Sequence, residues 1–265
     1  MRIFASIVAS SVLFTPLVST ASATGVSNNG NCLAFDVDAR IASHETAAYF
    51  ASWNIDSSED REFFVTDFAS PELIAAATGL GAAGGTHIRF GGTGNNFLRY
   101  GVGAAPPCSA GEPTCLNETH WEGMITLAAN ARSPIIFGVN FGVRRGGKNK
   151  TFDPKNAMEF FEFAHARGDH IWGVENGNEI NLLLTAEEQA TGLMVLDDAL
   201  KIVYGNDPRP FLVGPDALGI HMPGLNKTDD IPTGLTIKYL SDFVVAMDGR
   251  LRAVTHHEYS ESGAK

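Results

Sequence analysis

The chain has 265 residues, of which 19 are Lys or Arg and 30 are Asp or Glu, so its formal charge at pH 7 is -11. A net charge of this sign repels phosphate backbones and argues against nucleic acid as a partner. The composition is ordinary for a globular protein, and the length fits one large α/β domain or two small domains.

The first 23 residues have the pattern of a secretory signal peptide. Arg2 precedes an apolar stretch over residues 3–18, and Ala21-Ser22-Ala23 is a small-x-small cleavage pattern. The stretch is interrupted by serines and Pro16, which makes it marginal for the ~20 residues of a membrane span. We therefore expect a secreted mature chain over residues 24–265. Any association with a membrane or cell surface is not encoded by a transmembrane segment.

Three cysteines fit an oxidising compartment. Cys108 and Cys115 bracket a turn-rich segment and are predicted to form a disulfide. Cys32 is then left as a free thiol or with a partner outside this sequence. Glycosylation sequons begin at Asn117, Asn149 and Asn226 and are compatible with surface loops.

Short apolar runs alternate with longer segments of helical periodicity, and this alternation predicts βαβ units with a parallel sheet. Strands are predicted over residues 33–37, 87–90, 134–139, 170–174, 210–214 and 252–256. Helices are predicted over residues 71–78, 118–131, 153–167, 185–204 and 235–248. Asp153 before Pro154 and a capping box from Thr185 to Glu188 indicate two helix starts, and Gly168 and Gly205 indicate helix ends.

Six such units leave two architectures open: a doubly wound open sheet, and a (β/α)8 barrel of the TIM type with about six βα units present. The glycines at 79, 81 and 84 match a dinucleotide-binding fingerprint, which would favour the open sheet and a dehydrogenase. That fingerprint must follow a strand and open a helix. Here the glycines end a predicted helix and precede a strand, so we interpret them as a turn and expect no cofactor.

The segment 171–181 (Ile-Trp-Gly-Val-Glu-Asn-Gly-Asn-Glu-Ile-Asn) takes a buried strand directly into a polar cluster. Ligand chemistry gathers at the C-terminal ends of parallel strands. Glycosidic cleavage needs one carboxylic acid to protonate the leaving oxygen and a second carboxylate across the anomeric carbon. From these residues alone, the pair Asn178-Glu179 fits such a site, a helix cap or a surface turn.

The segment 177–181 also resembles the acid/base motif at the end of the fourth barrel strand in clan A glycosidases. The segment 87–93 (His-Ile-Arg-Phe-Gly-Gly-Thr) resembles the second-strand motif of glycoside hydrolase family 79, the family of heparanase and β-glucuronidases. Segments that resemble the first, third, fifth and sixth strands lie at 35–39, 135–140, 212–216 and 254–259. The resemblance is colinear from about residue 33 to residue 260. It implies a (β/α)8 barrel that hydrolyses O-glycosyl bonds with retention and without a cofactor.

The resemblance also implies roles for individual residues. Glu179 matches the general acid/base of the family, and Asn178 matches the neighbouring sugar-binding amide. Asp38, Thr93, His257 and Tyr259 match positions that line the sugar subsite, whereas Ile180 replaces the proline usual after the acid/base. The expected partner is a glucuronide or a glycan that contains uronic acid.

In the family the nucleophile lies at the end of the seventh strand, whereas this sequence ends just past the sixth. We therefore expect a C-terminally truncated chain without the nucleophile and without the family's C-terminal β-sandwich. Neither Glu258 nor Glu261 matches the nucleophile motif. A catalytically inactive glycan-binding protein is the alternative to a hydrolase.

Two further features have weaker interpretations. The basic loop over residues 144–150 contacts a uronic-acid carboxylate or is simply a solvated loop. His256, His257 and Glu258 are adjacent on a strand and point to alternate faces, so we expect no metal there.

Overall fold

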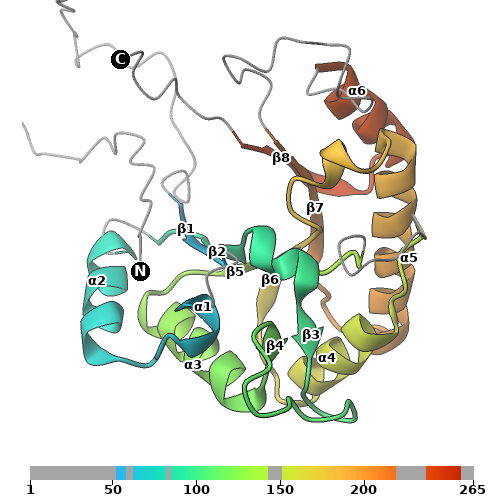
Figure 1. Ribbon diagram of the computed structural model, residues 1–265. Helices are drawn as coiled ribbons and strands as arrows, with labels where there is room; N and C mark the ends of the chain where they lie inside the picture. Colours follow the sequence, from blue (N-terminus) through green and yellow to red (C-terminus); the bar gives the residue numbers. More distant parts are fainter. Residues whose placement is uncertain (1–51, 58–61, 82–84, 143–150, 219–236, 258–265) are drawn as a thin grey trace, which may run out of the picture.

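The computed structural model describes residues 52–57, 62–81, 85–142, 151–218 and 237–257. Within them, six parallel strands form one sheet in the order β1-β2-β5-β6-β7-β8 (Figure 1). The strands are β1 (Trp53–Asp56), β2 (Ile88–Gly91), β5 (Ile135–Val139), β6 (Ile171–Asn176), β7 (Phe211–Ala217) and β8 (Leu251–His256).

Helices lie between the strands in chain order, as a series of βα units requires. They are α1 (Glu62–Val65), α2 (Pro71–Gly81), α3 (Glu118–Asn130), α4 (Lys155–Ala166), α5 (Ala186–Tyr204) and α6 (Ile237–Ala246). The strands predicted from residue 87 onward and the five predicted helices are confirmed within a few residues. The glycines at 79 and 81 lie in the last turn of α2 and precede β2, so they end a helix and do not open one.

The first strand of the described sheet differs from the predicted one. β1 pairs in parallel with β2, from Trp53 opposite Ile88 to Asp56 opposite Gly91. The strand predicted over residues 33–37 lies outside the described residues. β1 is not predicted from the sequence, because its alternating pattern Trp-Asn-Ile-Asp is not the continuous apolar run that identifies the other strands.

Side-chain contacts across the sheet show that it is curled. Three strand spacings separate β2 from β7, which is roughly 14 Å in a flat sheet. Nevertheless the guanidinium of Arg89 on β2 contacts carboxylates of Glu175 on β6 and Asp216 on β7. The strands therefore bend around a common axis, and the sheet is part of a (β/α)8 barrel, as predicted.

The main hydrophobic core lies between the outer face of the sheet and the helices. Phe90 and Phe137 of the sheet are fully buried there with Trp121 of α3 and Phe160 of α4. The rings of Trp121 and Phe160 meet edge to face at 4.8 Å, and Phe137 lies 5.1 Å from Phe160. This aromatic cluster fixes α3 and α4 on the sheet.

Helix ends are held by specific side chains. The capping box of α5 is confirmed, because Thr185 and Glu188 each accept a backbone N–H from the other residue. Gly168, after α4, has φ 74°, the left-handed conformation predicted for a helix end. At the start of α4 the prediction was displaced by one residue: Pro154 occupies the cap position, and Asp153 accepts a hydrogen bond from the N–H of Lys155 at 3.0 Å.

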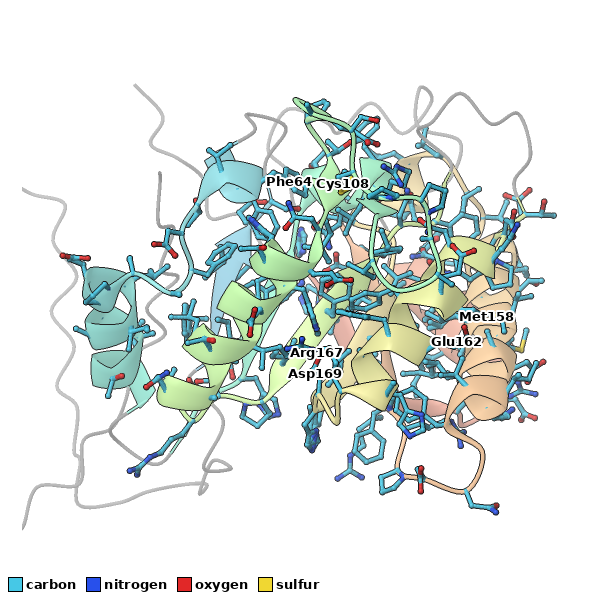
Figure 2. The ribbon with its side chains drawn as sticks, turned by 90° about the horizontal axis from the view of Figure 1, so that it is seen from below. Phe64, Cys108, Met158, Glu162, Arg167 and Asp169 are labelled. Atoms are coloured by element: carbon cyan, nitrogen blue, oxygen red, sulfur yellow. A yellow bond between two sulfur atoms is a disulfide. The ribbon has the colours of Figure 1, made fainter. Side chains whose placement is uncertain are left out.

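Asp169 connects the segment after α4 to Trp121 of α3. Its carboxylate accepts hydrogen bonds from the indole of Trp121 at 2.8 Å and from Arg167 at 3.1 Å. Arg167 and Asp169 lie together at this end of the helical layer (Figure 2). The bond satisfies the polar atom of a tryptophan that is otherwise fully buried.

A short two-stranded sheet, β3 (Arg99–Tyr100) with β4 (Cys115–Leu116), follows β2. The predicted disulfide between Cys108 and Cys115 is present. The signal peptide, Cys32 and the sequons at Asn149 and Asn226 lie outside the described residues. Within the described part of the chain, no helix combines the length and apolar character needed to cross a membrane.

Candidate active site

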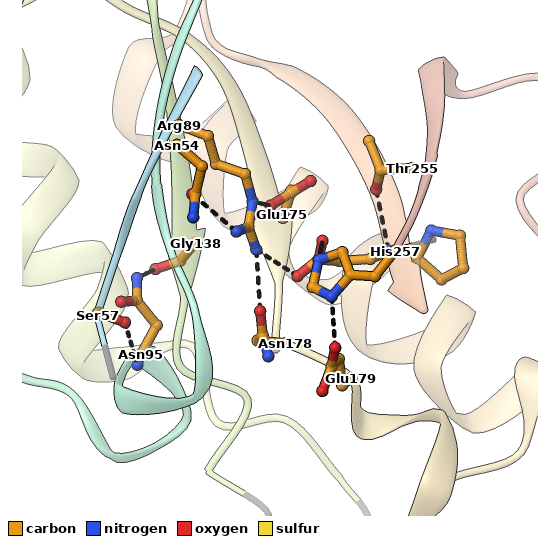
Figure 3. A network of polar contacts seen from close by, with 12 residues as sticks. Asn54, Ser57, Arg89, Asn95, Gly138, Glu175, Asn178, Glu179, Thr255 and His257 are labelled. Carbon is orange, nitrogen blue, oxygen red and sulfur yellow. Dashed lines mark hydrogen bonds and ion pairs between the residues drawn. The ribbon is translucent and has the colours of Figure 1, made fainter. Parts of the chain in front are cut away.

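A polar cluster lies on the inner face of the curled sheet, toward the C-terminal ends of its strands (Figure 3). Arg89 belongs to β2, Glu175 to β6 and Asp216 to β7. Glu179 and His257 follow the ends of β6 and β8. In barrels of this type, the C-terminal ends of the strands carry the chemistry.

Arg89 is the centre of this cluster. Its guanidinium donates to Glu175 Oε2 at 2.6 Å, to Asn54 Oδ1 at 3.0 Å and to Asn178 Oδ1 at 3.1 Å, and it also forms an ion pair with Asp216. Although burial opposes its charge, the two carboxylates raise the pKa of Arg89 further above its ordinary value. Arg89 is therefore a permanent cation that cross-links four strands.

The two carboxylates beside Arg89 have pKa values displaced in opposite directions. Burial raises the pKa of Glu175, an effect that Arg89 only partly offsets. Burial also disfavours the charge of Asp216, but the positive charges of Arg89 and His257 hold its pKa below the ordinary value. Asp216 is thus a buried carboxylate that stays ionised because two cations compensate it.

The paired glycines after β2 make room for this cluster. A Cβ atom at Gly91 would collide with the guanidinium of Arg89, and one at Gly92 would collide with the carboxylate of Asp56. Gly92 also has φ 136°, which disfavours other residues. Asp56 is exposed by accessible surface, but partial desolvation beside the cluster raises its pKa, with Arg89 and His257 acting in the opposite direction.

The turn that presents Glu179 is held from two sides. The side chain of Asn96 accepts from the backbone N–H of Asn178 at 2.8 Å and donates to its carbonyl at 2.7 Å. The N–H of Glu179 donates to the carbonyl of Asp216 at 3.0 Å. Glu179 itself has φ 52°, a left-handed conformation that costs a non-glycine residue about 1 kcal/mol or more. These contacts offset the strain and fix the direction of the carboxyl group.

Ile180 begins the short helix η2 (Ile180–Leu182) and is fully buried. Its side chain packs against Gly177, where a Cβ atom would collide with it. The turn is therefore completed by apolar packing.

His257 links Glu179 to the buried cluster. Its Nδ1 lies 2.5 Å from Glu179 Oε1, and its Nε2 lies 2.8 Å from Asp216 Oδ1. Burial disfavours the imidazolium, but the charge of Asp216 and hydrogen bonds to both carboxylates raise the pKa of His257 to about 10.

The structure brings together three of the residues predicted for the site: Asn178, Glu179 and His257. Thr93, also predicted, begins the 3-10 helix η1 (Thr93–Phe97) just after β2, at the same end of the sheet. Asp38 and Tyr259 lie outside the described residues, as do Glu258, Glu261 and the basic loop over 144–150.

Four residues of the cluster have no role predicted from the sequence: Asp56, Arg89, Glu175 and Asp216. Arg89 and Asp216 lay inside motifs that carried the family resemblance, and Glu175 lay one residue before the end of β6. The signal that could have found them is a charged residue within an otherwise apolar strand, since such a residue must find a partner when buried. Asp56 belongs to the strand that was missed.

The cluster can donate and accept protons at Glu179 and can donate hydrogen bonds through the amide of Asn178. Among the described residues, no group of three His, Cys, Asp or Glu side chains is arranged to hold a metal ion.

Comparison with known sequences identifies the family. The profile described as "Glycosyl hydrolase family 79, N-terminal domain" matches residues 76–221, which include Arg89, Glu175, Glu179 and Asp216. The chain belongs to glycoside hydrolase family 79. No curated protein sequence matches the chain.

Among solved structures, the chain is similar to a Paenibacillus polymyxa xyloglucanase from glycoside hydrolase family 44, with 13% identity and a TM-score of 0.40. The match covers 64% of this chain and 48% of the xyloglucanase, so the chain spans about half the length of that protein. It is also similar to an endo-1,4-beta-mannanase from Rhizomucor miehei, with 11% identity and a TM-score of 0.42 over 80% of this chain and 67% of the mannanase.

Proposed function

We propose that the site binds a β-linked glucuronic acid residue and that Glu179 is the general acid/base of a retaining glycoside hydrolase. The observation that carries the proposal is the position of Glu179. It stands at the rim of the polar cluster, with its side chain 16% exposed and its backbone fixed by Asn96 and Asp216. A general acid must be accessible to the glycosidic oxygen and fixed in direction, and Glu179 meets both conditions.

The neighbouring groups support a sugar ligand. Asn178 accepts from Arg89 through its side-chain oxygen, which orients its amide nitrogen as a donor for a hydroxyl group. The family membership supports a glycan as the substrate class. The narrower choice of a uronic acid rests on the resemblance to β-glucuronidases and heparanase, as does retention of configuration.

The disulfide between Cys108 and Cys115 supports the proposal that the protein is secreted. Disulfides persist in oxidising compartments and are rare in the cytosol. A secreted protein would share its compartment with extracellular glycans.

A second candidate function is glycan binding without hydrolysis. Retention requires a second carboxyl about 5 to 5.5 Å from the acid/base. The described carboxylate that shares His257 with Glu179 is Asp216, and it is occupied by Arg89 and by His257. We therefore do not assign Asp216 as the nucleophile.

The test is to express residues 24–265, measure the affinity for phenyl β-D-glucuronide by calorimetry, and assay release of 4-nitrophenol from its nitrophenyl analogue. The corresponding β-glucosides, which carry a hydroxymethyl group in place of the carboxylate, serve as matched ligands. Glu179→Gln keeps the shape of the side chain and removes its acid function.

Turnover that falls by about 10² or more in Glu179→Gln would support the hydrolase. Glucuronide binding without turnover would support the second function. Equal affinity for glucoside and glucuronide would overturn the uronic-acid specificity, and the absence of binding to either sugar would overturn both functions.

A further inference from the structure

His257 presents each of its ring nitrogens to a different carboxylate, as Figure 3 shows for Glu179. The two carboxylates are not equivalent. The side chain of Asp216 is 2% exposed, whereas that of Glu179 is 16% exposed at the rim. Asp216 is therefore a fixed internal acceptor, and Glu179 is the carboxyl that a ligand can reach.

The surroundings of Asp216 determine which ring nitrogen carries a proton. Its carboxylate accepts from Arg89, and its backbone N–H donates to Thr255 Oγ1 at 2.9 Å. An ionised carboxylate can only accept hydrogen bonds, so the Nε2 that faces it must be protonated. In the neutral imidazole, Nδ1 is then bare and faces Glu179.

We propose that Asp216 and His257 form a proton-holding pair for Glu179, in which Asp216 fixes one proton on Nε2 while Nδ1 and Glu179 Oε1 exchange a second. Asp216 and His257 are thus positioning residues that act through Glu179. The proton-holding pair is inferred from the contacts of His257 with Asp216 and Glu179. Its role in catalysis rests on the proposed function.

The exchange balances over a catalytic cycle. At rest, the imidazolium donates from Nδ1 to the Glu179 carboxylate. When Glu179 protonates the leaving oxygen, the bond between the anomeric carbon and that oxygen breaks with its electron pair on the oxygen, and the carbon bonds to the carboxylate nucleophile that retention requires, which we assign to no described residue. The Nδ1 proton then moves to Glu179, and His257 becomes neutral. When water attacks the anomeric carbon, the bond to that carboxylate breaks, and Glu179 takes a proton from the water and returns it to Nδ1. One proton leaves with the alcohol, and one arrives from water.

The charges around His257 favour the imidazolium at rest. Among the described residues, Asp216 from β7, Glu179 from the end of β6 and Asp56 from β1 are acidic, whereas Arg89 from β2 is basic. Burial alone would lower the pKa of His257, and the carboxylates raise it to about 10. His257 therefore carries a proton on both ring nitrogens at neutral pH.

The test is NMR of the full chain labelled with ¹⁵N-histidine, in which the ring-nitrogen shifts report the protonation and tautomer of His257. We expect His257 to be doubly protonated at pH 7 and to titrate near 10. In Asp216→Asn the midpoint should fall by about two pH units or more, because burial then dominates. The control is Asp207→Asn, which removes the exposed partner of His165, 3.0 Å away, and should leave His257 unchanged.

An unchanged titration of His257 in Asp216→Asn would overturn the proposal. Because Asp216 also pairs with Arg89, that variant could fail to fold, and Glu179→Gln then provides the decision. In Glu179→Gln, Asp216 still accepts a hydrogen bond from Nε2. At a pH where His257 of this variant is neutral, its remaining ring proton must therefore be on Nε2. A proton on Nδ1 instead would overturn the proposal.

Substrate measurements separate the pair from the proposed function. If wild-type protein turns over the glucuronide, Asp216→Asn should shift the pH profile of kcat, whereas Asp207→Asn should not. If wild-type protein neither binds nor turns over glucuronide, the proposed function fails while the NMR result still decides the proton pair.

Discussion

Alternate residues of the same strands form the two faces of the curled sheet, and the two faces are stabilised by different interactions. On β2, Ile88 and Phe90 point outward into the helical core, whereas Arg89 between them points inward to Glu175 and Asp216. The outer face is held by apolar burial, which is non-directional and tolerates repacking. The inner face is held by charges and hydrogen bonds, each of which needs a particular partner in a particular direction.

This difference indicates that the inner face positions the residues of a site and contributes less to the free energy of unfolding than apolar packing would. In barrels of this type, bulky branched apolar side chains usually fill the interior. Here a buried ion-pair network replaces part of that filling, and such a network adds little net stability compared with apolar packing. Its benefit is the fixed geometry that it gives to Asn178, Glu179 and His257.

Arg89→Met should disrupt the inner face, with a loss of stability as large as that of any change considered for the outer face. The change leaves Glu175 and Asp216 buried without their shared cation, and loss of one partner of a buried pair costs about 3 to 5 kcal/mol of unfolding free energy. Urea unfolding measures the loss. Arg167→Met removes the half-exposed partner of Asp169 and should cost less than about 1 kcal/mol. Equal losses for the two variants would show that the Arg89 network contributes no more to stability than a partly exposed ion pair.

Phe160→Ala tests the outer face. The ring of Phe160 is fully buried between Trp121, Phe137 and Phe161, so its removal should cost about 3 to 5 kcal/mol of unfolding free energy. Below the unfolding transition, glucuronide affinity should remain within about twofold of wild type, because the core is separate from the polar cluster. Phe160→Leu should cost less, and a large change in affinity in either variant would show that the faces are coupled.

The pH dependence of stability gives the smallest effect. His120 lies among Phe63, Phe64 and Phe68, and burial lowers its pKa to about 4. The unfolded chain, with a pKa near ~6.5, therefore binds the proton first as the pH falls. Stability should be unaffected above that pH and should drop by on the order of 3 kcal/mol between ~6.5 and 4.

His120→Phe provides the control for this prediction, because a phenyl ring suits the same aromatic surroundings and does not titrate. Urea unfolding between pH 7 and pH 4 should show a shallower loss of stability in His120→Phe than in wild type. Identical pH dependence in the two proteins would mean that His120 is not buried as the neutral imidazole.

Much of this arrangement could be predicted from the sequence, and the exceptions have physical causes. Apolar runs and helix caps give the βα order because they depend on local burial and backbone hydrogen bonds. The strand β1 was missed because its half-buried residues alternate in polarity. Glu175 and Asp216 were not recognised because their role depends on Arg89, which lies far away in sequence and meets them only when the sheet curls.

The site was predicted in part for the same reason. Asn178, Glu179 and His257 lie in segments whose resemblance to family 79 gave them roles. By contrast, nothing in the local sequence indicates that His257 bridges Glu179 and Asp216, since this contact joins three segments separated by more than 30 residues each.

The most direct test of the central claim is a crystal structure of the chain with a thio-linked aryl β-D-glucuronide, which cannot be hydrolysed readily and needs no nucleophile to bind. We expect the glycosidic sulfur within about 3.5 Å of a Glu179 carboxyl oxygen, with the amide nitrogen of Asn178 on a sugar hydroxyl. A ligand bound elsewhere, or bound on the inner face with its glycosidic atom turned away from Glu179, would contradict the account.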